Sequence, residues 1–301
     1  MKTSKQKSFT LIELLVVIVI ISILSSIIIF STGSTLEKQT KMEALNFSTS
    51  LKNKHAEFLI SEWTFNGQTK AGQSAVNADV KDSWGYNNGS ITGQVTVRDG
   101  EDCISGKCLE FDGGYMTAKT ELTDDKAPIS IELWLNIPSS FIWSNGTIGS
   151  LEASTGGIGI FRNTSNNVLT FVARIGSISM YGAQDYTIKR DRFYHLAFAG
   201  NGTTFNVYVD GRKINEILKG YGRKANESIT GTFYLGHSKT YEESGGGYLK
   251  GIIDEVRLYN SALSSSEIKQ NYIAGLDSLL ANKAISKEEY HQRIFNLANH
   301  E

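Results

Sequence analysis

The sequence predicts a mainly β protein with one long helix at its N-terminus and a short helical segment at its C-terminus. Three observations predict this fold class. An apolar run fills residues 9–30, short β-prone runs separated by Gly, Asn, Ser and Asp follow Trp63, and helical patterns return after Leu263. We therefore divide the chain into a leader (1–8), an N-terminal helix (9–59), a β domain (60–263) and a helical tail (264–301).

The composition narrows the function classes. The chain has 301 residues, of which 30 are basic and 31 acidic, so its formal net charge is −1. This balance predicts no nucleic-acid partner, because no part of the chain is rich enough in Lys and Arg to attract a polyanion. The length predicts one large domain or two small ones beside the N-terminal helix.

The apolar run is long enough, at 1.5 Å per residue, to cross a bilayer core of roughly 30 Å. Lysines in the leader precede it, which predicts a cytoplasmic N-terminus and an exterior remainder. Glu13 lies inside the run, and a carboxylate is costly in lipid, so Glu13 is a candidate functional residue. An ordinary secretory signal has a shorter apolar stretch with a small-residue cleavage site after it.

The segment Ser8-Phe9-Thr10-Leu11-Ile12-Glu13, after its basic leader, resembles the class III signal of type IV prepilins and pseudopilins. That family has Gly before the cleavage point, where this chain has Ser8. The resemblance implies that a prepilin peptidase cuts between Ser8 and Phe9 and methylates the amine of Phe9. It also implies that Glu13 pairs with the N-terminal amine of a neighbouring subunit during assembly. A plain membrane anchor is the alternative interpretation.

The same resemblance implies a location. The protein would cross the cytoplasmic membrane once, with its C-terminal domain outside, and would join a cell-surface filament after assembly. The helix is expected to continue beyond the membrane, because residues at three-to-four spacing follow Leu36 and no Gly or Pro occurs between Thr35 and Trp63.

The β domain is predicted from short runs with turn residues between them, a spacing typical of an all-β sandwich. Residues 129–137 alternate strictly between apolar and other side chains, and Asp210-Gly211 joins two β-prone runs as a two-residue hairpin turn. We expect strands at 62–65, 91–94, 109–111, 115–118, 129–137, 147–150, 158–162, 168–172, 177–181, 193–200, 204–209, 212–216, 232–237 and 251–259.

Ordered motifs over about residues 60–268 resemble the LamG-like, concanavalin A-type jelly-roll family, which implies a jelly-roll β-sandwich. The motifs are Glu62-Trp63-Thr64-Phe65, Asp82-Ser83-Trp84-Gly85, Cys108-Leu109-Glu110-Phe111-Asp112, Arg192-Phe193-Tyr194-His195 and Asp254-Glu255-Val256-Arg257-Leu258-Tyr259. Trp63, Trp134 and His195 fall within predicted strands and are expected to be packed. In the tail, Ser264 with Glu267 and Ser286 with Glu289 form capping-box patterns, which predict an αα-hairpin packed on the domain or a mobile tail.

The chain has two cysteines, Cys103 and Cys108, which the predicted topology places outside the cytoplasm. Thiols oxidise there, and the short loop with a glycine can bring the two Cα atoms within disulfide range. A free pair and a metal site are the alternatives, and a metal site needs more ligands than this stretch offers.

Asp82 and Asp254 are the candidate metal ligands, because Ca²⁺ prefers carboxylate and carbonyl oxygens. In the LamG-like family an Asp of the early loop and the Asp of the closing strand often hold a structural calcium ion, which implies that role for these two residues. The alternative is that Asp82 closes an Asx-turn and Asp254 is a hydrogen-bonded strand residue.

No catalytic motif predicts an enzyme. Glycosidases on this scaffold need two carboxylates facing each other across a cleft. Glu132 is the single acid of its predicted strand, and Asp254 and Glu255 are adjacent, which predicts that they point to opposite faces.

A binding role remains. The sequence predicts a type IV pilin-like or pseudopilin filament subunit whose exterior head binds carbohydrate or protein. Trp143, Tyr181, Tyr221 and Tyr241 lie in or near loops where they could stack on sugars. The alternatives are a secretion-system pseudopilin, a membrane-tethered adhesin that does not polymerise and, with less support, a glycan-processing enzyme.

Overall fold

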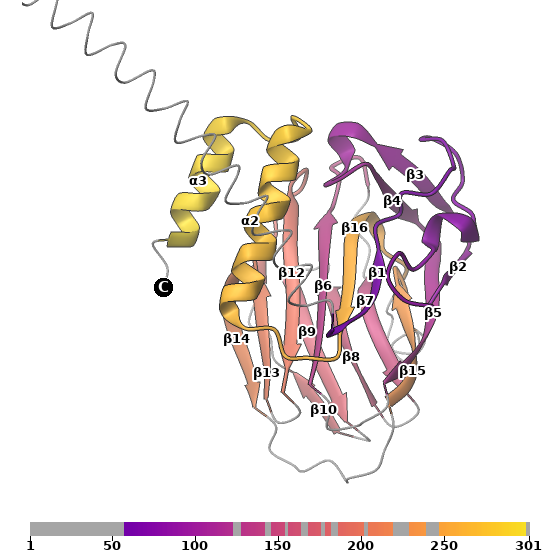
Figure 1. The fold of residues 1–301 in the computed structure, drawn as a ribbon, viewed down its shortest axis with the longest axis vertical. Helices are drawn as coiled ribbons and strands as arrows, with labels where there is room; N and C mark the ends of the chain where they lie inside the picture. Colours follow the sequence, from indigo (N-terminus) through magenta and orange to yellow (C-terminus); the bar gives the residue numbers. More distant parts are fainter. Residues whose placement is uncertain are drawn as a thin grey trace, which may run out of the picture. The chain divides into compact units, whose positions relative to one another are not determined.

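The computed structural model describes residues 57–122, 128–141, 146–153, 156–163, 168–175, 178–181, 186–201, 204–218, 229–238 and 247–298 (Figure 1). They belong to one compact unit, Asn53–Glu301. The predicted leader and apolar run, with Ser8, Phe9 and Glu13, lie outside these residues. No helix within the described segments is both long and apolar enough to cross a membrane.

The described residues form a sandwich of two eight-stranded antiparallel sheets, named sheet A and sheet B. Sheet A has the order β14-β13-β12-β6-β16-β4-β3, and β1 pairs with β16. Its strands are β1 (Leu59–Trp63), β3 (Val95–Asp99), β4 (Lys107–Asp112), β6 (Ile129–Asn136), β12 (Phe193–Gly200), β13 (Thr204–Val209), β14 (Arg212–Leu218) and β16 (Lys250–Tyr259).

Sheet B has the order β10-β9-β8-β7-β15-β5-β2, and β11 pairs with β9. Its strands are β2 (Gly89–Thr92), β5 (Tyr115–Leu122), β7 (Gly146–Ala153), β8 (Gly156–Asn163), β9 (Val168–Ile175), β10 (Ile178–Tyr181), β11 (Tyr186–Thr187) and β15 (Ile229–Leu235). Trp63 of sheet A stacks on Phe233 of sheet B, with ring centroids 5.2 Å apart, so the main core lies between the sheets.

The alternation predicted for 129–137 is confirmed. Leu133 and Leu135 of β6 belong to the core between the sheets, whereas Trp134 packs in a second cluster on the outer face of sheet A. The predicted hairpin is confirmed as well, because Asp210 and Gly211 both have positive φ, +51° and +73°.

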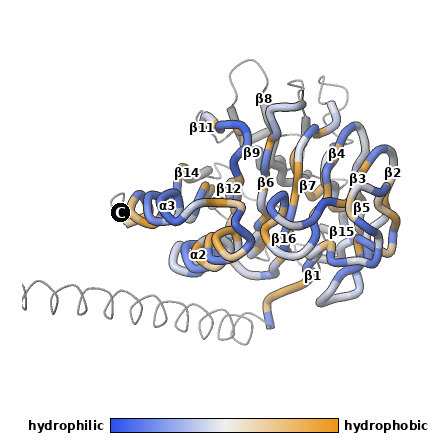
Figure 2. Tube along the Cα trace, turned by 90° about the horizontal axis from the view of Figure 1, so that it is seen from above, coloured by the Kyte–Doolittle hydropathy of each residue, from blue (hydrophilic) through white to orange (hydrophobic). Residues whose placement is uncertain are grey.

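Two helices cover the outer face of sheet A, α2 (Ser265–Ala281) and α3 (Lys287–Ala298). Figure 2 shows them on the side of β12 and β14. The predicted capping box starts α2, since the backbone N–H of Glu267 donates to Ser264 Oγ and that of Ser264 donates to Glu267 Oε2. A Cβ on Gly275 would come within 2.1 Å of the Trp134 ring, so this glycine permits α2 to approach the sheet. The packed hairpin, rather than a mobile tail, is thus the arrangement found.

Several boundaries differ from the prediction, and two of the observed strands were not predicted. Residues 57–58 form a turn and β1 begins at Leu59, so the predicted helix over 9–59 does not reach its last residues. The strand predicted at 91–94 ends at Thr92, because Gly93 (φ +78°) turns the chain into β3, a strand that was not predicted. The two-residue strand β11 was not predicted either, because two residues carry no periodic pattern.

Candidate functional site

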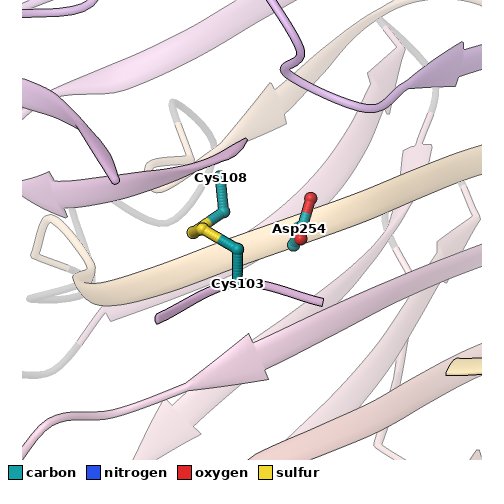
Figure 3. Close-up of side chains that lie close together, drawn as sticks. All are labelled: Cys103, Cys108 and Asp254. Carbon is teal, nitrogen blue, oxygen red and sulfur yellow. A yellow bond between two sulfur atoms is a disulfide. The ribbon is translucent and has the colours of Figure 1, made fainter. Parts of the chain in front are cut away.

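Cys103 and Cys108 form a disulfide that closes a short loop before β4 (Figure 3). Their Cα atoms are 5.4 Å apart, and both residues are fully buried beside the helices of the tail. The predicted bond is therefore present. The loop is attached to α2 as well, because the side-chain amide of Asn282 donates to the backbone oxygen of Ile104 at 2.9 Å.

Asp254, fully buried in β16, attaches this loop to sheet A. Its Oδ2 accepts from the backbone N–H groups of Ile104 (2.8 Å) and Ser105 (3.2 Å), and its Oδ1 accepts from Glu255 N (2.8 Å). Burial, followed by the neighbouring Glu255 carboxylate, raises the pKa of Asp254 well above its usual range. This is the hydrogen-bonded strand role, the alternative to calcium in the sequence-based prediction.

Asp82 has a comparable set of donors at another position. Its Oδ1 accepts from the backbone N–H groups of Glu62 (3.0 Å), Trp84 (3.0 Å) and Gly85 (2.8 Å), and its Oδ2 accepts from Asn87 N (3.0 Å). The carboxylate thus fixes the loop over residues 82–88 against β1, as an Asx-turn does.

The surroundings of the two candidate ligands do not fit Ca²⁺. The oxygens of Asp82 and Asp254 face N–H donors, whereas calcium needs six to eight oxygens directed at one point. Asp254 does lie with Cys103 and Cys108 in a cluster whose ligand atoms are within 4.8 Å of one another, and no second such cluster occurs among the described residues. Both sulfurs are in the disulfide and offer no thiolate.

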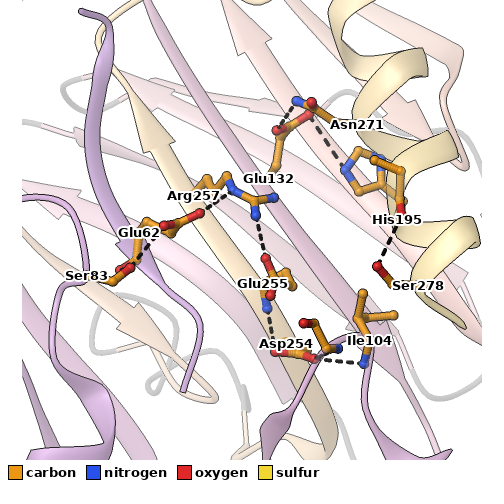
Figure 4. Close-up of polar contacts among 12 residues, drawn as sticks. Glu62, Ser83, Ile104, Glu132, His195, Asp254, Glu255, Arg257, Asn271 and Ser278 are labelled. Atoms are coloured by element: carbon orange, nitrogen blue, oxygen red, sulfur yellow. Dashed lines mark hydrogen bonds and ion pairs between the residues drawn. The ribbon is translucent and has the colours of Figure 1, made fainter. Parts of the chain in front are cut away.

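The outer face of sheet A carries a buried polar network, shown in Figure 4. Arg257 is at its centre: its Nε donates to Glu62 Oε1 at 2.9 Å and its Nη2 contacts Glu255 Oε2. The expectation that Asp254 and Glu255 point to opposite faces was wrong. Glu255 has φ +49° and the register with β6 shifts between Asp254 and Arg257, so a β-bulge interrupts the alternation.

Glu132 is the single acid of β6, as predicted, and its partners come from other elements. Its Oε2 accepts from the Asn271 side chain (2.8 Å) and from Tyr259 OH (3.2 Å), and its Oε1 lies 3.6 Å from His195 Nε2. These partners come from α2, β16 and β12, and Arg257 faces Glu132 across the β6–β16 pair. The sequence does give one signal for this site, because Glu132 is a charged residue in a strand that is buried on both faces. Its partners could not be predicted, since they lie far away in the chain.

Burial sets the charge state of this pair. Glu132 and His195 are each 1% exposed. Burial raises the pKa of Glu132 to about 7, although Arg257, Asn271 and Tyr259 act in the opposite direction. Burial, and then the positive charge of Arg257, lowers the pKa of His195 to about 3. Because α2 covers both groups, this cluster is closed to a substrate and serves to hold the helix on the sheet.

The outer face of sheet B carries a group of aromatic rings formed by Tyr115, Tyr234, His237 and Tyr248, named the aromatic cluster. Tyr248 stacks on His237 with centroids 4.7 Å apart, and Tyr115 lies 5.0 Å from His237 and 6.1 Å from Tyr248. Met116 and Phe233 belong to the core, so the alternate residues Tyr115 and Tyr234 face away from it.

The aromatic cluster is partly accessible. Tyr248 is 38% exposed. Close by in the chain, Lys250 and Asp112 form an ion pair at 2.8 Å with about a third of each side chain exposed. The cluster was not predicted, because its members come from three separated segments. Of the loop aromatics proposed for sugars, Trp143, Tyr221 and Tyr241 lie outside the described residues, and so does the side chain of Tyr181.

Residues 111–269 match the concanavalin A-like lectin/glucanase superfamily, and residues 3–29 match the prokaryotic N-terminal methylation motif. The first match spans more than half of the chain, so this protein belongs to the concanavalin A-like lectin/glucanase superfamily. Both resemblances seen in the sequence are thereby confirmed. No curated protein matches the chain.

Solved structures with the same fold are distant in sequence. Domain 4 of AbnA, a GH43 extracellular arabinanase from Geobacillus stearothermophilus in complex with arabinotriose, aligns with a TM-score of 0.54 and 20% identity over 70% of this chain and 97% of that one. Botulinum neurotoxin type C, described as interacting with two ganglioside molecules, aligns with a TM-score of 0.52 and 12% identity. The alignment covers 75% of this chain and 52% of that one. Trypanosoma rangeli sialidase aligns with a TM-score of 0.50 and 16% identity over 74% of this chain and 33% of that one. This chain therefore spans about half the length of the neurotoxin chain and about a third of the sialidase chain.

Proposed function

We propose that this chain is a subunit of a type IV pilin-like surface filament and that its concanavalin A-like head binds carbohydrate. The observation that carries the proposal is the combination, in one chain, of the methylation motif at residues 3–29 with a lectin-like domain whose exposed sheet face bears the aromatic cluster. A prepilin peptidase would process the chain at Ser8 and Phe9, and the apolar run would hold it in the membrane before assembly.

Glu13 provides the assembly step of this proposal. A carboxylate in the hydrocarbon core is costly unless it is paired, and the processed amine of Phe9 on a neighbouring subunit is a cation available at the same depth. Pairing in a low dielectric would fix the axial register of successive subunits.

Replacement of Glu13 by Ala should therefore leave the protein in the membrane fraction and abolish its recovery in sheared filaments. Immunoblots of both fractions measure this, and mass spectrometry of the mature N-terminus should find methylated Phe9 in the wild type and the variant. The matched control Glu57→Ala, outside the apolar run, should assemble normally. Normal filaments from Glu13→Ala would refute the role, and a mature chain beginning at Met1 would indicate a tethered adhesin instead.

The aromatic cluster supports carbohydrate as the ligand of the head. The rings of Tyr248 and Tyr115 offer apolar faces on which a pyranose can stack. The arabinotriose complex and the ganglioside interaction of two structural neighbours are consistent with this ligand class, although those likenesses are of fold alone.

Tyr248→Ala should weaken glycan binding by about fivefold to tenfold, because one stacking contact contributes about 1 kcal/mol. A glycan array probed with the full chain in detergent would first select the ligand, and titration calorimetry would then compare the variants. Phe295→Ala removes a more exposed ring from α3, 63% against 38%, and should not change affinity. If the array is negative and the chain instead retains a protein, the carbohydrate proposal is wrong.

A further inference from the structure

The loop over residues 82–88 displays two large aromatic side chains to solvent. Trp84 is 48% exposed and Tyr86 is 98% exposed. Phe58, in the turn before β1, is 38% exposed as well. Exposed rings scattered singly need no explanation, but two on one short loop do.

The backbone of this loop is held by many contacts. The Asp82 carboxylate accepts four backbone N–H groups, three of them within the loop. Asn87 then joins the loop to β1, since its backbone oxygen accepts from Trp63 Nε1 (3.1 Å) and its side-chain amide donates to Ser61 Oγ (2.7 Å). A Cβ on Gly85 would lie 2.3 Å from the backbone oxygen of Ile60, so the loop lies directly on the strand.

Rings presented by a fixed backbone suit a protein interface. Trp and Tyr dominate the binding energy of protein contacts, and a preorganised loop avoids the entropy cost of ordering on association. The hydrogen bonds to Asp82 hold the loop in one conformation, and this conformation keeps the rings of Trp84 and Tyr86 exposed to solvent. This arrangement favours a partner with a protein surface.

The position of the loop in the chain indicates which protein its rings contact. β1 follows the N-terminal segment directly in the chain, and the methylation motif lies in that segment. In a filament built through that segment, the part of the head adjoining it is brought nearest to neighbouring copies. A loop that contacts a different surface of the next copy is a heterologous contact, and such contacts generate open helical filaments. We infer that Trp84 and Tyr86 contact a second copy of this chain, an inference that rests on the proposed filament.

The inference can be tested with a photocrosslinking residue. With p-benzoylphenylalanine in place of Tyr86 in the full chain, irradiation of cells should give adducts whose peptides come from this same chain. The same residue in place of Phe295 on α3, also well exposed, is the matched control and should give few. Adducts only to other proteins, or none from position 86, would overturn the inference.

A second measurement gives the energetic role. Trp84→Ser with Tyr86→Ser removes exposed rings, so the head should fold, and recovery in sheared filaments should fall at least about tenfold. Glycan affinity should be unchanged. If this double variant assembles normally, or loses glycan binding instead, the loop is no subunit contact. If the chain with p-benzoylphenylalanine at position 86 crosslinks to itself although the wild type forms no filaments, the proposed function is contradicted and the contact is left intact.

Discussion

Replacing Arg257 with Met should lower the free energy of unfolding by about 2–4 kcal/mol at pH 7, because the change leaves buried carboxylates without their cation. The Arg257 guanidinium contacts Glu62 and Glu255 and faces Glu132, whose side chains are 1–14% exposed. Methionine retains much of the side-chain volume, so the loss reports the charge rather than a cavity. The Arg257 side chain itself is 24% exposed, which places the effect below that of a fully buried pair.

Chemical denaturation of the full chain in detergent, followed by near-ultraviolet circular dichroism, measures this loss. Arg98→Met is the matched control, because Arg98 also pairs with one glutamate, Glu110, at 2.8 Å, but is 38% exposed. A surface pair of this kind contributes at most about 1 kcal/mol. Equal losses in the two variants would show that the network under α2 is not desolvated.

Glu132→Gln should stabilise the protein above pH 7 by up to about 3 kcal/mol and have little effect below pH 4.5. Burial raises the pKa of Glu132 from its ordinary 4.5 to about 7, so the folded state holds a proton that the unfolded state has already lost between these values. The stability that depends on this proton is present below pH 4.5 and is lost as the pH rises towards 7. Glutamine resembles the neutral acid and removes the loss.

His195 has the opposite pH dependence. Its pKa falls from 6.5 to about 3, so the unfolded state binds the extra proton and the folded state gains stability as the pH rises from about 3 to 6.5. In the wild type the two slopes oppose each other between pH 4.5 and 6.5. The test is therefore the difference in unfolding free energy between Glu132→Gln and wild type, measured at steps from pH 4 to 8.

That difference should grow steadily with pH and level off near 7. Asp112→Asn, on the partly exposed Asp112–Lys250 pair, should show no comparable growth. A Glu132→Gln variant that is less stable than wild type at pH 8 would mean that the pairing of ionised Glu132 with Arg257 outweighs the cost of its burial, and the raised pKa of Glu132 would then be wrong.

Features of the chain that depend on neighbouring residues could be predicted from the sequence. Strict alternation placed Leu133 and Trp134 on opposite faces of β6, and Asp210-Gly211 turned the β13–β14 hairpin, because a pleated strand and a tight turn are local requirements. The disulfide between Cys103 and Cys108 could also be predicted, because only five positions separate the two cysteines in the chain.

Features that join distant segments were decided by the tertiary structure. The sequence does not show that Glu132 meets His195, Tyr259 and Asn271, since pairing of β6 with β12 and β16, and the packing of α2, bring them together. The aromatic cluster arises in the same way from β5, β15 and the segment before β16.

The sequence by itself determined the class of molecule: a methylation motif joined to a concanavalin A-like domain, both written in short contiguous patterns. Only the tertiary structure decided the roles of the two aspartates, since a carboxylate binds whichever donors the fold directs at it. For Asp82 and Asp254 these donors are backbone N–H groups, so both carboxylates hold a loop against sheet A.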